Sequence, residues 1–448
     1  MHHFRHFWSN VRSSFWFVPS LIVLGSIAFA VALIETDSAG GDRWLGHWPY
    51  LFGAGAEGAR QMLSTLAGSM MSVMGITFSM TLVALALASS QYTSRILRTF
   101  MSSRVTQVTL GIFAGIFAYC LVVLRTIRSE DVEFVPGLAV FVSFVLSLGG
   151  IGVLVYFIHH IASSIQASSI IASIAEETFA SIDRLFPERL GHEPDEDEDP
   201  EQIVQSLDEK GWYPVPAATN GYIQSVDNDA LLRLARDKKT VVRMECRIGD
   251  FVVKDTALAS LALDEPPDRA TIAALNDAYN VDRYRTVEQD PAFGIRQLVD
   301  MALKALSPGV NDTSTAVICV DYISAILAHL APRKFPASRR YENNKLCVIT
   351  MAPTFEAFVT EAFEQIGGSA EGNVAIMARM MSAFETLADL TTSPRRRRAL
   401  QEQVRRVAEL AGRTTEATHD RERIAKRLME VREALQAEPA LTAEETTA

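Results

Sequence analysis

Residues 134–161 read FVPGLAVFVSFVLSLGGIGVLVYFIHHI, a run of apolar residues that contains no Asp, Glu, Lys or Arg. A helix needs about 20 such residues to cross the hydrocarbon core of a bilayer, where lipid offers the backbone no hydrogen-bond partner. The run is therefore predicted to be a transmembrane helix, and it places the chain in a membrane.

Three earlier runs meet the same requirement, and the charges between them predict an orientation. The runs are residues 16–34, 65–90 and 107–124. Lys and Arg stay on the cytoplasmic side, and the arginines before the first run and between the second and third runs are Arg5, Arg12, Arg95, Arg98 and Arg104. We expect a multi-pass protein of the cell inner (plasma) membrane with four transmembrane helices over residues 1–165 and both termini in the cytoplasm.

Two of these runs contain small residues at helical spacing. Gly68, Ser72, Gly75 and Ser79 form a stripe on the second run, and Gly111 and Gly115 form a GxxxG motif on the third. Small residues let transmembrane helices approach closely. Two interpretations stay open: packing within one four-helix bundle, or an oligomer face that joins copies of the chain or lines a pore. The absence of charged residues within the runs disfavours proton- or ion-coupled transport.

Beyond the membrane, the helical pattern of the fourth run continues to Phe186 without Gly or Pro, which predicts a continuous cytoplasmic stalk over residues 166–190. The segment HEPDEDEDPE (192–201) contains five consecutive acids, Asp195 to Asp199, so residues 191–211 are predicted to form an acidic linker. Residues 438–448 are expected to be a disordered tail.

The rest of the chain is predicted to be a cytoplasmic α+β domain. GYIQSV (221–226) and TVVRMECR (240–247) have the composition and alternation of strands, which indicates a small β-barrel-like unit over residues 212–265. Residues 266–390 are predicted to form helical hairpins, followed by C-terminal helices over 391–437. In these helices the run Arg395–Arg398 is expected to lie on a solvated face, with contact to anionic lipid as the alternative.

The segment SPGVNDTSTA (307–316) could be a turn or a site. Ser307-Pro308-Gly309 ends one helix, and Asp312 is suited to cap the next, so an αα-hairpin turn accounts for these residues. Anion binding stays open, because a helix N-terminus attracts anions and arginines lie nearby in sequence. The candidate anion-binding residues are Arg283, Arg285, Arg296, Asp312 and Thr313.

Composition limits the remaining function classes. The formal net charge of −11 argues against nucleic acid as a partner. The four cysteines form no CxxC pair, so no metal site is predicted. No histidine lies near the serines of the 307–316 segment, so we predict no catalytic residue, and we expect no cofactor.

Several segments resemble a family of prokaryotic integral membrane proteins catalogued as domain of unknown function 2254. They are RTVEQDPAFGIRQLVDMALKALSPGVNDTSTAV (285–317), residues 82–128, YFIHHIASSIQ (156–166), GYIQSVDNDALLRLA (221–235) and GDFVV (249–253). The likeness extends over about residues 12 to 390, with Thr313 standing where the family often has proline. The resemblance implies a multi-span membrane protein with a cytoplasmic domain, and it implies no activity.

Three functional hypotheses follow. The first is a non-enzymatic, channel-like or ligand-responsive membrane module, with homo-oligomerisation and an anionic ligand left open. The second is a membrane-anchored enzyme that acts on an anionic or lipid-linked substrate. The third is a structural scaffold.

Overall fold

The computed structural model describes residues 16–38, 55–91, 104–128, 134–186, 211–342 and 345–437. The chain divides into two compact units, residues 1–169 and 170–448. The predicted tail (438–448) and the predicted acidic linker, apart from Gly211, lie outside the described residues.

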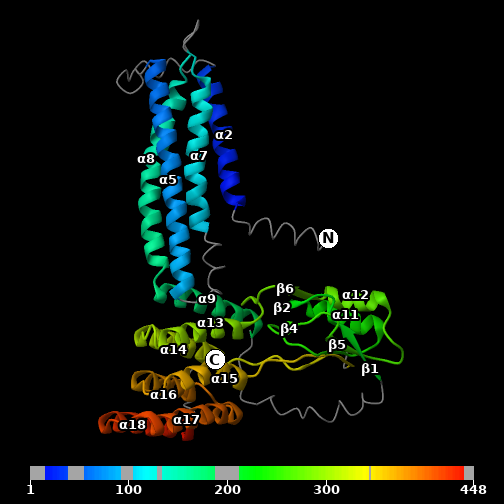
Figure 1. Cartoon of the computed structure of the whole chain (residues 1–448). Helices are drawn as coiled ribbons and strands as arrows, with labels where there is room; N and C mark the ends of the chain where they lie inside the picture. The colour runs from blue at the N-terminus through cyan, green and yellow to red at the C-terminus, as the bar shows by residue number, and fades with distance from the viewer. Residues whose placement is uncertain are drawn as a thin grey trace, which may run out of the picture. The chain divides into compact units, whose positions relative to one another are not determined.

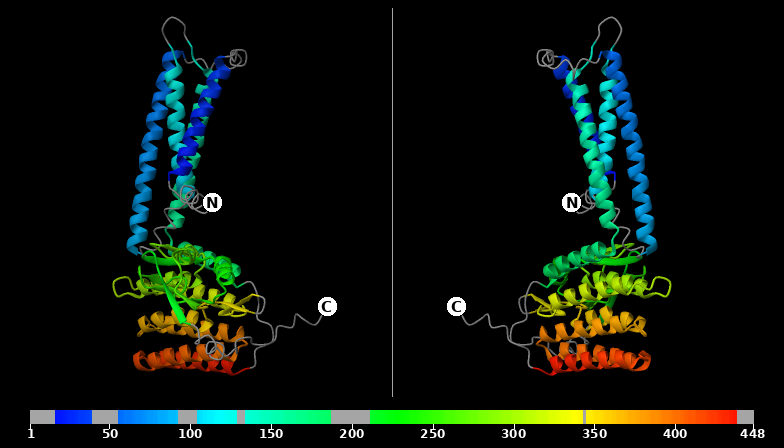
Figure 2. Two further views of the ribbon diagram at one scale, coloured as in Figure 1. Left: turned by 90° about the vertical axis from the view of Figure 1, so that its right-hand side faces the viewer. Right: turned by 90° about the vertical axis from the view of Figure 1, so that its left-hand side faces the viewer.

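In its described part, the first unit consists of four long apolar helices that run side by side (Figures 1 and 2). The most buried is α7, which packs against all three others. Its Tyr119 hydroxyl donates a hydrogen bond of 2.9 Å to the carbonyl oxygen of Ala139, so this polar group is satisfied among apolar neighbours. The helices are α2 (Phe17–Ser38), α5 (Ala56–Gln91), α7 (Arg104–Thr126) and α8 (Gly137–Ser164).

The expected count of four transmembrane helices is not confirmed, because five described helices are long and apolar enough to cross a membrane. The fifth is α14 (Thr313–Leu330), which belongs to the second unit. It packs against α13 (Pro291–Leu306) and α16 (Val374–Asp389). The core of the second unit thus contains a helix whose length and composition also suit a bilayer.

The continuous helix predicted to run to Phe186 is wrong, because α8 ends at Ser164 and α9 (Ala167–Leu185) begins after a two-residue interruption. The Gln166 amide donates to the Ser163 carbonyl oxygen, a tighter turn than an α-helix makes. The Ser164 hydroxyl donates to the His160 carbonyl oxygen at 2.7 Å, and such bonds bend helices. From Ile170 onward α9 is an integral helix of the second unit, where Ile171 and Ile182 are fully buried.

The strands of the second unit form two sheets, so the predicted barrel-like unit is not confirmed. The five-stranded sheet has the order β1-β5-β3-β8-β7 and the three-stranded sheet has the order β4-β2-β6. The strands are β1 (Gly211–Pro216), β2 (Gly221–Val226), β3 (Val242–Met244), β4 (Phe251–Val252), β5 (Ala257–Leu263), β6 (Tyr279–Asp282), β7 (Arg339–Glu342) and β8 (Lys345–Ile349).

Sequence and structure agree on one strand and differ on the partners of the others. GYIQSV is confirmed as β2, whereas TVVRMECR contributes only the three residues of β3. The larger sheet is completed by β8, which pairs in parallel with β3 although it comes from a part of the chain expected to be helical. Two helices pack against the strands: α11 (Asn228–Lys238) contacts β8, and α12 (Arg269–Asp277) contacts β1 and β6.

The remaining helices of the second unit form two stacked rows (Figure 1). One row is α13, α15 (Phe355–Ser369) and α17 (Pro394–Thr414), and the other is α14, α16 and α18 (Thr418–Gln436). Four of these helices begin at a residue whose side chain accepts a hydrogen bond from a backbone amide of the first turn, which satisfies a donor that the helix leaves unpaired. Those residues are Asp290, Asp312, Thr354 and Asn373.

Candidate functional site

The small-residue stripe of α5 lies on the outside of the first unit. Gly68, Ser72, Gly75 and Ser79 are all exposed, and a Cβ atom built on Gly68 or Gly75 would meet no atom within 4 Å. The Ser72 hydroxyl donates to the Gly68 carbonyl oxygen at 3.0 Å, so this donor is satisfied within the helix. The stripe is therefore open to whatever surrounds α5.

The two glycines of the α7 motif are packed within the chain. A Cβ on Gly111 would lie 2.7 Å from Cδ1 of Ile22, and one on Gly115 would lie 2.5 Å from Oγ of Ser26. Both neighbours belong to α2, so the absence of side chains on α7 lets these two helices approach closely. Within one unit, the structure thus separates glycines that are packed from glycines that face outward.

The outward face of α8 also has two open glycines, Gly149 and Gly152, but they lie among large apolar side chains rather than in a row of small residues. Its exposed residues include Leu148, Ile151 and Val155, whose exposed fractions are 60%, 56% and 63%. Large apolar side chains of this kind suit contact with lipid tails, whereas small residues mark close contacts between helices. The α5 stripe is therefore the candidate interaction surface of the first unit.

Arg285, one of the candidate anion-binding residues, is paired with a carboxylate at the start of α13. Its Nη2 and Nε atoms donate to Asp290 Oδ2 at 2.6 and 2.9 Å. Burial raises the pKa of Asp290, and the guanidinium of Arg285 opposes this shift. A Cβ on Gly249 would overlap both side chains, so the 247–250 turn needs glycine there. Two segments that carry the family resemblance, GDFVV and 285–317, meet at this contact.

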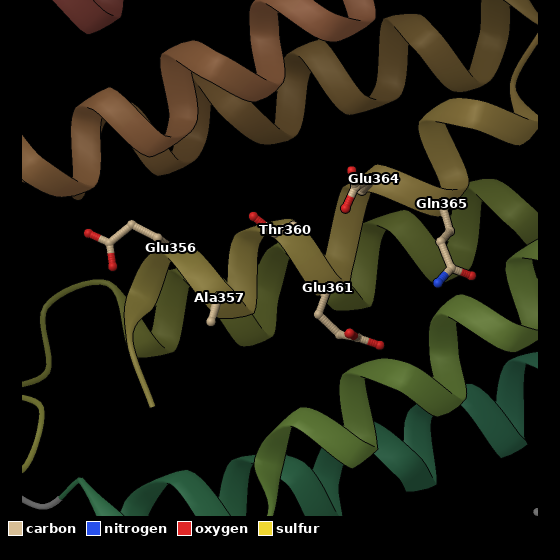
Figure 3. A pocket seen from close by; sticks show the side chains of 6 residues that line it. All are labelled: Glu356, Ala357, Thr360, Glu361, Glu364 and Gln365. Atoms are coloured by element: carbon tan, nitrogen blue, oxygen red, sulfur yellow. The ribbon is translucent and has the colours of Figure 1, made fainter. Parts of the chain in front are cut away.

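Arg296 is paired as well, and its partner lines a hollow on α15. It donates to Asp300 Oδ1 at 2.9 Å and to Glu361 Oε1 at 3.3 Å. The hollow, about 320 Å³ in volume, runs along one face of α15 (Figure 3). Glu364 in the same hollow accepts from Arg406 of α17 at 2.7 Å. These ion pairs join α15 to the helices on either side of it in the row.

The turn that contains Asp312 and Thr313 has a structural role. Asp312 accepts hydrogen bonds from the Thr315 amide at 3.1 Å and the Thr315 hydroxyl at 2.6 Å, which confirms it as the cap of α14. These bonds hold the pKa of Asp312 below its usual range. The Thr313 hydroxyl accepts a bond of 2.9 Å from Asn373, the cap of α16. The start of α14 is thereby fastened to the start of α16.

The structure does not bring the five candidate anion-binding residues together. Arg283 and Arg285 precede α13, whereas Asp312 and Thr313 follow it, and a helix of 16 residues is about 24 Å long. Arg283 is exposed, while Arg285 and Arg296 already have carboxylate partners. The arrangement supports a structural role for these arginines better than a shared anion pocket.

Sequence reasoning missed that two arginines of the 395–398 run, which was expected to lie on a solvated face, bond to backbone carbonyl oxygens of other segments. Arg396 is only 1% exposed, donates to the Ala331 carbonyl oxygen at 2.7 Å and lies 4.8 Å from the ring centroid of Phe335. Arg397 donates to carbonyl oxygens at the ends of α16 and α18, including that of Leu435 at 3.0 Å. A guanidinium can satisfy several unpaired helix carbonyls at once, but the sequence carries no local signal of this use.

Comparisons with known proteins agree with the apolar helices of the first unit. The family described as predicted membrane protein (DUF2254) matches residues 12–386. The chain belongs to this family. It is 31% identical over 371 residues to uncharacterised proteins of Mycobacterium bovis and Mycobacterium tuberculosis, in alignments that cover 81% of this chain and 70% of each relative. No solved structure matches the chain. The chain is thus a membrane protein whose family and relatives bring no activity with them.

Proposed function

We propose that this protein is a non-enzymatic inner-membrane module that assembles with copies of itself through α5 and acts as a channel-like or ligand-responsive unit. The observation that carries the proposal is the outward stripe of small residues on α5, where Gly68 and Gly75 have no neighbour within 4 Å of a Cβ position. The packed glycines of α7 provide the internal comparison, because small residues on that helix have a partner helix in the same chain.

Lipid tails and a second protein helix differ in how closely they can pack against such a stripe. Lipid tails are as apolar as leucine, so helices in a bilayer associate through close van der Waals packing rather than by escaping water. A stripe of Gly and Ser offers lipid little surface, but it allows a second helix to approach along its whole length. A partner α5 from another copy has the same shape, and symmetric contacts of this kind close into oligomers.

The proposal includes four transmembrane helices with both termini in the cytoplasm. The fifth apolar helix, α14, is assigned to the soluble part because Ile323, Ile326 and Leu327 are fully buried within the second unit. The arginines of the sequence before α2 and between α5 and α7 support a cytoplasmic location for those segments. A reporter fused after Ala448 is expected to be active only in its cytoplasmic form, and a periplasmic signal would overturn this orientation.

Substitution on α5 tests the assembly without disturbing the monomer. Gly75→Leu adds a large side chain where the chain itself leaves open space, so we expect a folded protein whose oligomer dissociates. Gly152→Leu on α8 is the matched control, because Gly152 also has no atom within 4 Å of its Cβ position. Size-exclusion chromatography with light scattering in mild detergent, and crosslinking in membranes, measure the subunit number.

The outcomes separate the parts of the proposal. Loss of the oligomer with Gly75→Leu but not with Gly152→Leu supports assembly through α5. A wild-type protein that is monomeric in both measurements refutes it. Flux of small ions or solutes into liposomes containing the wild-type oligomer, reduced by Gly75→Leu, supports the channel-like form; an oligomer without flux leaves only the ligand-responsive form.

A further inference from the structure

The two C-terminal helices, α17 and α18, are basic, although the chain as a whole is acidic. Between Pro394 and Gln436 the sequence has twelve Lys and Arg residues and seven Asp and Glu residues, whereas the whole chain has a formal net charge of −11. Four of the arginines occupy the first turn of α17, which contains no acidic residue. The positive end of the helix dipole disfavours cations there, so negative charge nearby is stabilising.

Three of the four arginines are used within the described structure, and one is free to bind a further carboxylate. Arg395 pairs with Glu356 at 3.0 Å, and Arg396 and Arg397 donate to backbone carbonyl oxygens. Arg398 is exposed, and its one hydrogen bond among the described residues is to the Pro394 carbonyl oxygen of its own helix at 3.4 Å.

A second exposed arginine lies at the same end of the α17–α18 pair. Arg397 donates to the carbonyl oxygens of Leu435 and Ala437, which fixes the end of α18 beside the beginning of α17. Arg432, one turn before Leu435, is exposed, and its side chain has neither a hydrogen bond nor an ion pair within the described ranges. We call Arg398 and Arg432 the basic end of the pair.

The segment that precedes the acidic run leaves the described structure near the first turn of α17, where it is linked to Arg396. Phe186 is the last described residue before Gly211, and its carbonyl oxygen accepts a bond of 2.8 Å from Arg333. The Arg333 carbonyl oxygen accepts in turn from Arg396 at 3.1 Å. The ring of Phe335 lies 5.0 Å from that of Phe186 and 4.8 Å from the Arg396 guanidinium. Phe186 and the first turn of α17 are therefore joined by two successive contacts.

Charge and reach both match the acidic run to the basic end. Residues 193–201 contain seven acids, the first of them seven positions after Phe186. Seven extended residues span up to about 24 Å. We propose that the acidic run of residues 193–201 binds the basic end formed by Arg398 and Arg432 within the same chain. This contact neutralises the cations at the start of α17, and it does not depend on the proposed assembly through α5.

Zero-length carbodiimide crosslinking of the full-length protein in detergent tests the contact directly. Arg398→Lys and Arg432→Lys keep the charge and supply an amine, and mass spectrometry identifies the carboxylate that each lysine joins. We expect crosslinks from Lys at either position to residues 193–201. Arg413→Lys is the matched control, because Arg413 is exposed on the same helix but lies 15 residues away, about 22 Å along the axis.

Proteolysis provides a second measurement that does not need an added amine. A Glu-specific protease should cut the 193–201 segment about fivefold or more faster in Arg398→Glu/Arg432→Glu than in wild type at low salt, because two exposed ion pairs are lost and replaced by repulsion. The difference should disappear in 1 M salt, where the screening length falls to about 3 Å. Arg413→Glu should cleave as wild type does.

Three results would overturn the proposal. One is the absence of crosslinks from positions 398 and 432 to the acidic run, or an equal yield from position 413. Another is equal cleavage of wild type and the double variant at low salt. In a mixture of light and heavy isotope-labelled protein, crosslinks that join light to heavy chains would place the contact between copies instead of within one.

Discussion

Gly294 of α13 lies directly against Thr178 of α9, and this contact predicts that Gly294→Ala is destabilising. A Cβ on Gly294 would overlap the Thr178 hydroxyl oxygen and lie 3.0 Å from its Cβ and 3.1 Å from its Cγ2. The hydroxyl donates to the Ile174 carbonyl oxygen at 2.7 Å, so it does not turn aside without losing that bond. The two helices must therefore separate or shift to accept one methyl group.

The expected size of the effect follows from two opposing contributions. Adding a methyl group to a packed core costs about 1–3 kcal/mol. The preference of a helix for Ala over Gly returns up to about 1 kcal/mol. The overlap with three atoms of a buried Thr side chain favours the upper part of the first range, so we expect a net loss of about 1–2 kcal/mol. In a unit of this size that loss lowers the melting temperature by roughly 2–8 °C.

Thermal unfolding of the full-length protein in detergent, followed by circular dichroism, measures this change. Gly368→Ala in α15 is the matched control, because its Cβ would meet no atom within 4 Å. There the helix preference acts alone, and a gain of about 0.5–1 kcal/mol is expected. Thr178→Ala/Gly294→Ala should recover part of the loss, since the overlapping oxygen is removed. A Gly294→Ala protein that melts at or above wild type would refute the close approach of α9 and α13, as would strictly additive effects in the double variant.

Three further predictions concern side chains of the second unit. Arg396→Met should lower stability by about 1–3 kcal/mol in thermal melts, because it leaves the buried carbonyl oxygen of Ala331 unpaired. A loss no larger than that caused by Arg413→Met, at an exposed arginine of the same helix, would contradict this role. The hydrogen bond with His329, together with the guanidinium of Arg333, holds the pKa of Asp183 below its usual value. A lowered carboxylate pKa stabilises the fold above the unfolded pKa of about 4 and ceases to do so as the pH falls through the folded pKa. Asp183→Asn should therefore melt below wild type at pH 7, and the two should converge in acid; a constant difference would refute the assignment. Thr313→Val should cost about 0.5–1.5 kcal/mol in the same melts, because it removes the bond from the cap of α16; wild-type melting would show that this bond contributes nothing.

Local signals in the sequence predicted the features that depend on a few neighbouring residues. The apolar runs gave the helices of the first unit, since only length and composition decide whether a segment suits a bilayer. Asp312 was predicted as a cap and is one, because capping involves its own first turn alone. GYIQSV was predicted as a strand and forms β2. Each of these is a property of one segment.

Features that depend on distant partners escaped the sequence reading. The pairing of β3 with β8 joins residues more than a hundred positions apart, so a local pattern suggested a barrel where two sheets form. Arg396 and Arg397 belong to a run that is typical of a solvated helix face, and only the ends of other helices give them carbonyl partners. Anion binding by the arginines near α13 stayed open in the sequence, and the structure adds a bond from Arg296 to Glu361, 65 positions away on α15.

By itself, the sequence determined that the chain enters a membrane, because a backbone in lipid must bond within its own helix and only long apolar runs meet that condition. It also determined where several helices begin, since caps act within one turn. Only the tertiary structure decided that the glycines of α7 pack against α2 while those of α5 remain open, and that Arg296 pairs with Glu361 on a distant helix. Spacing along a helix shows which residues share a face, but what that face contacts depends on segments far away in the chain.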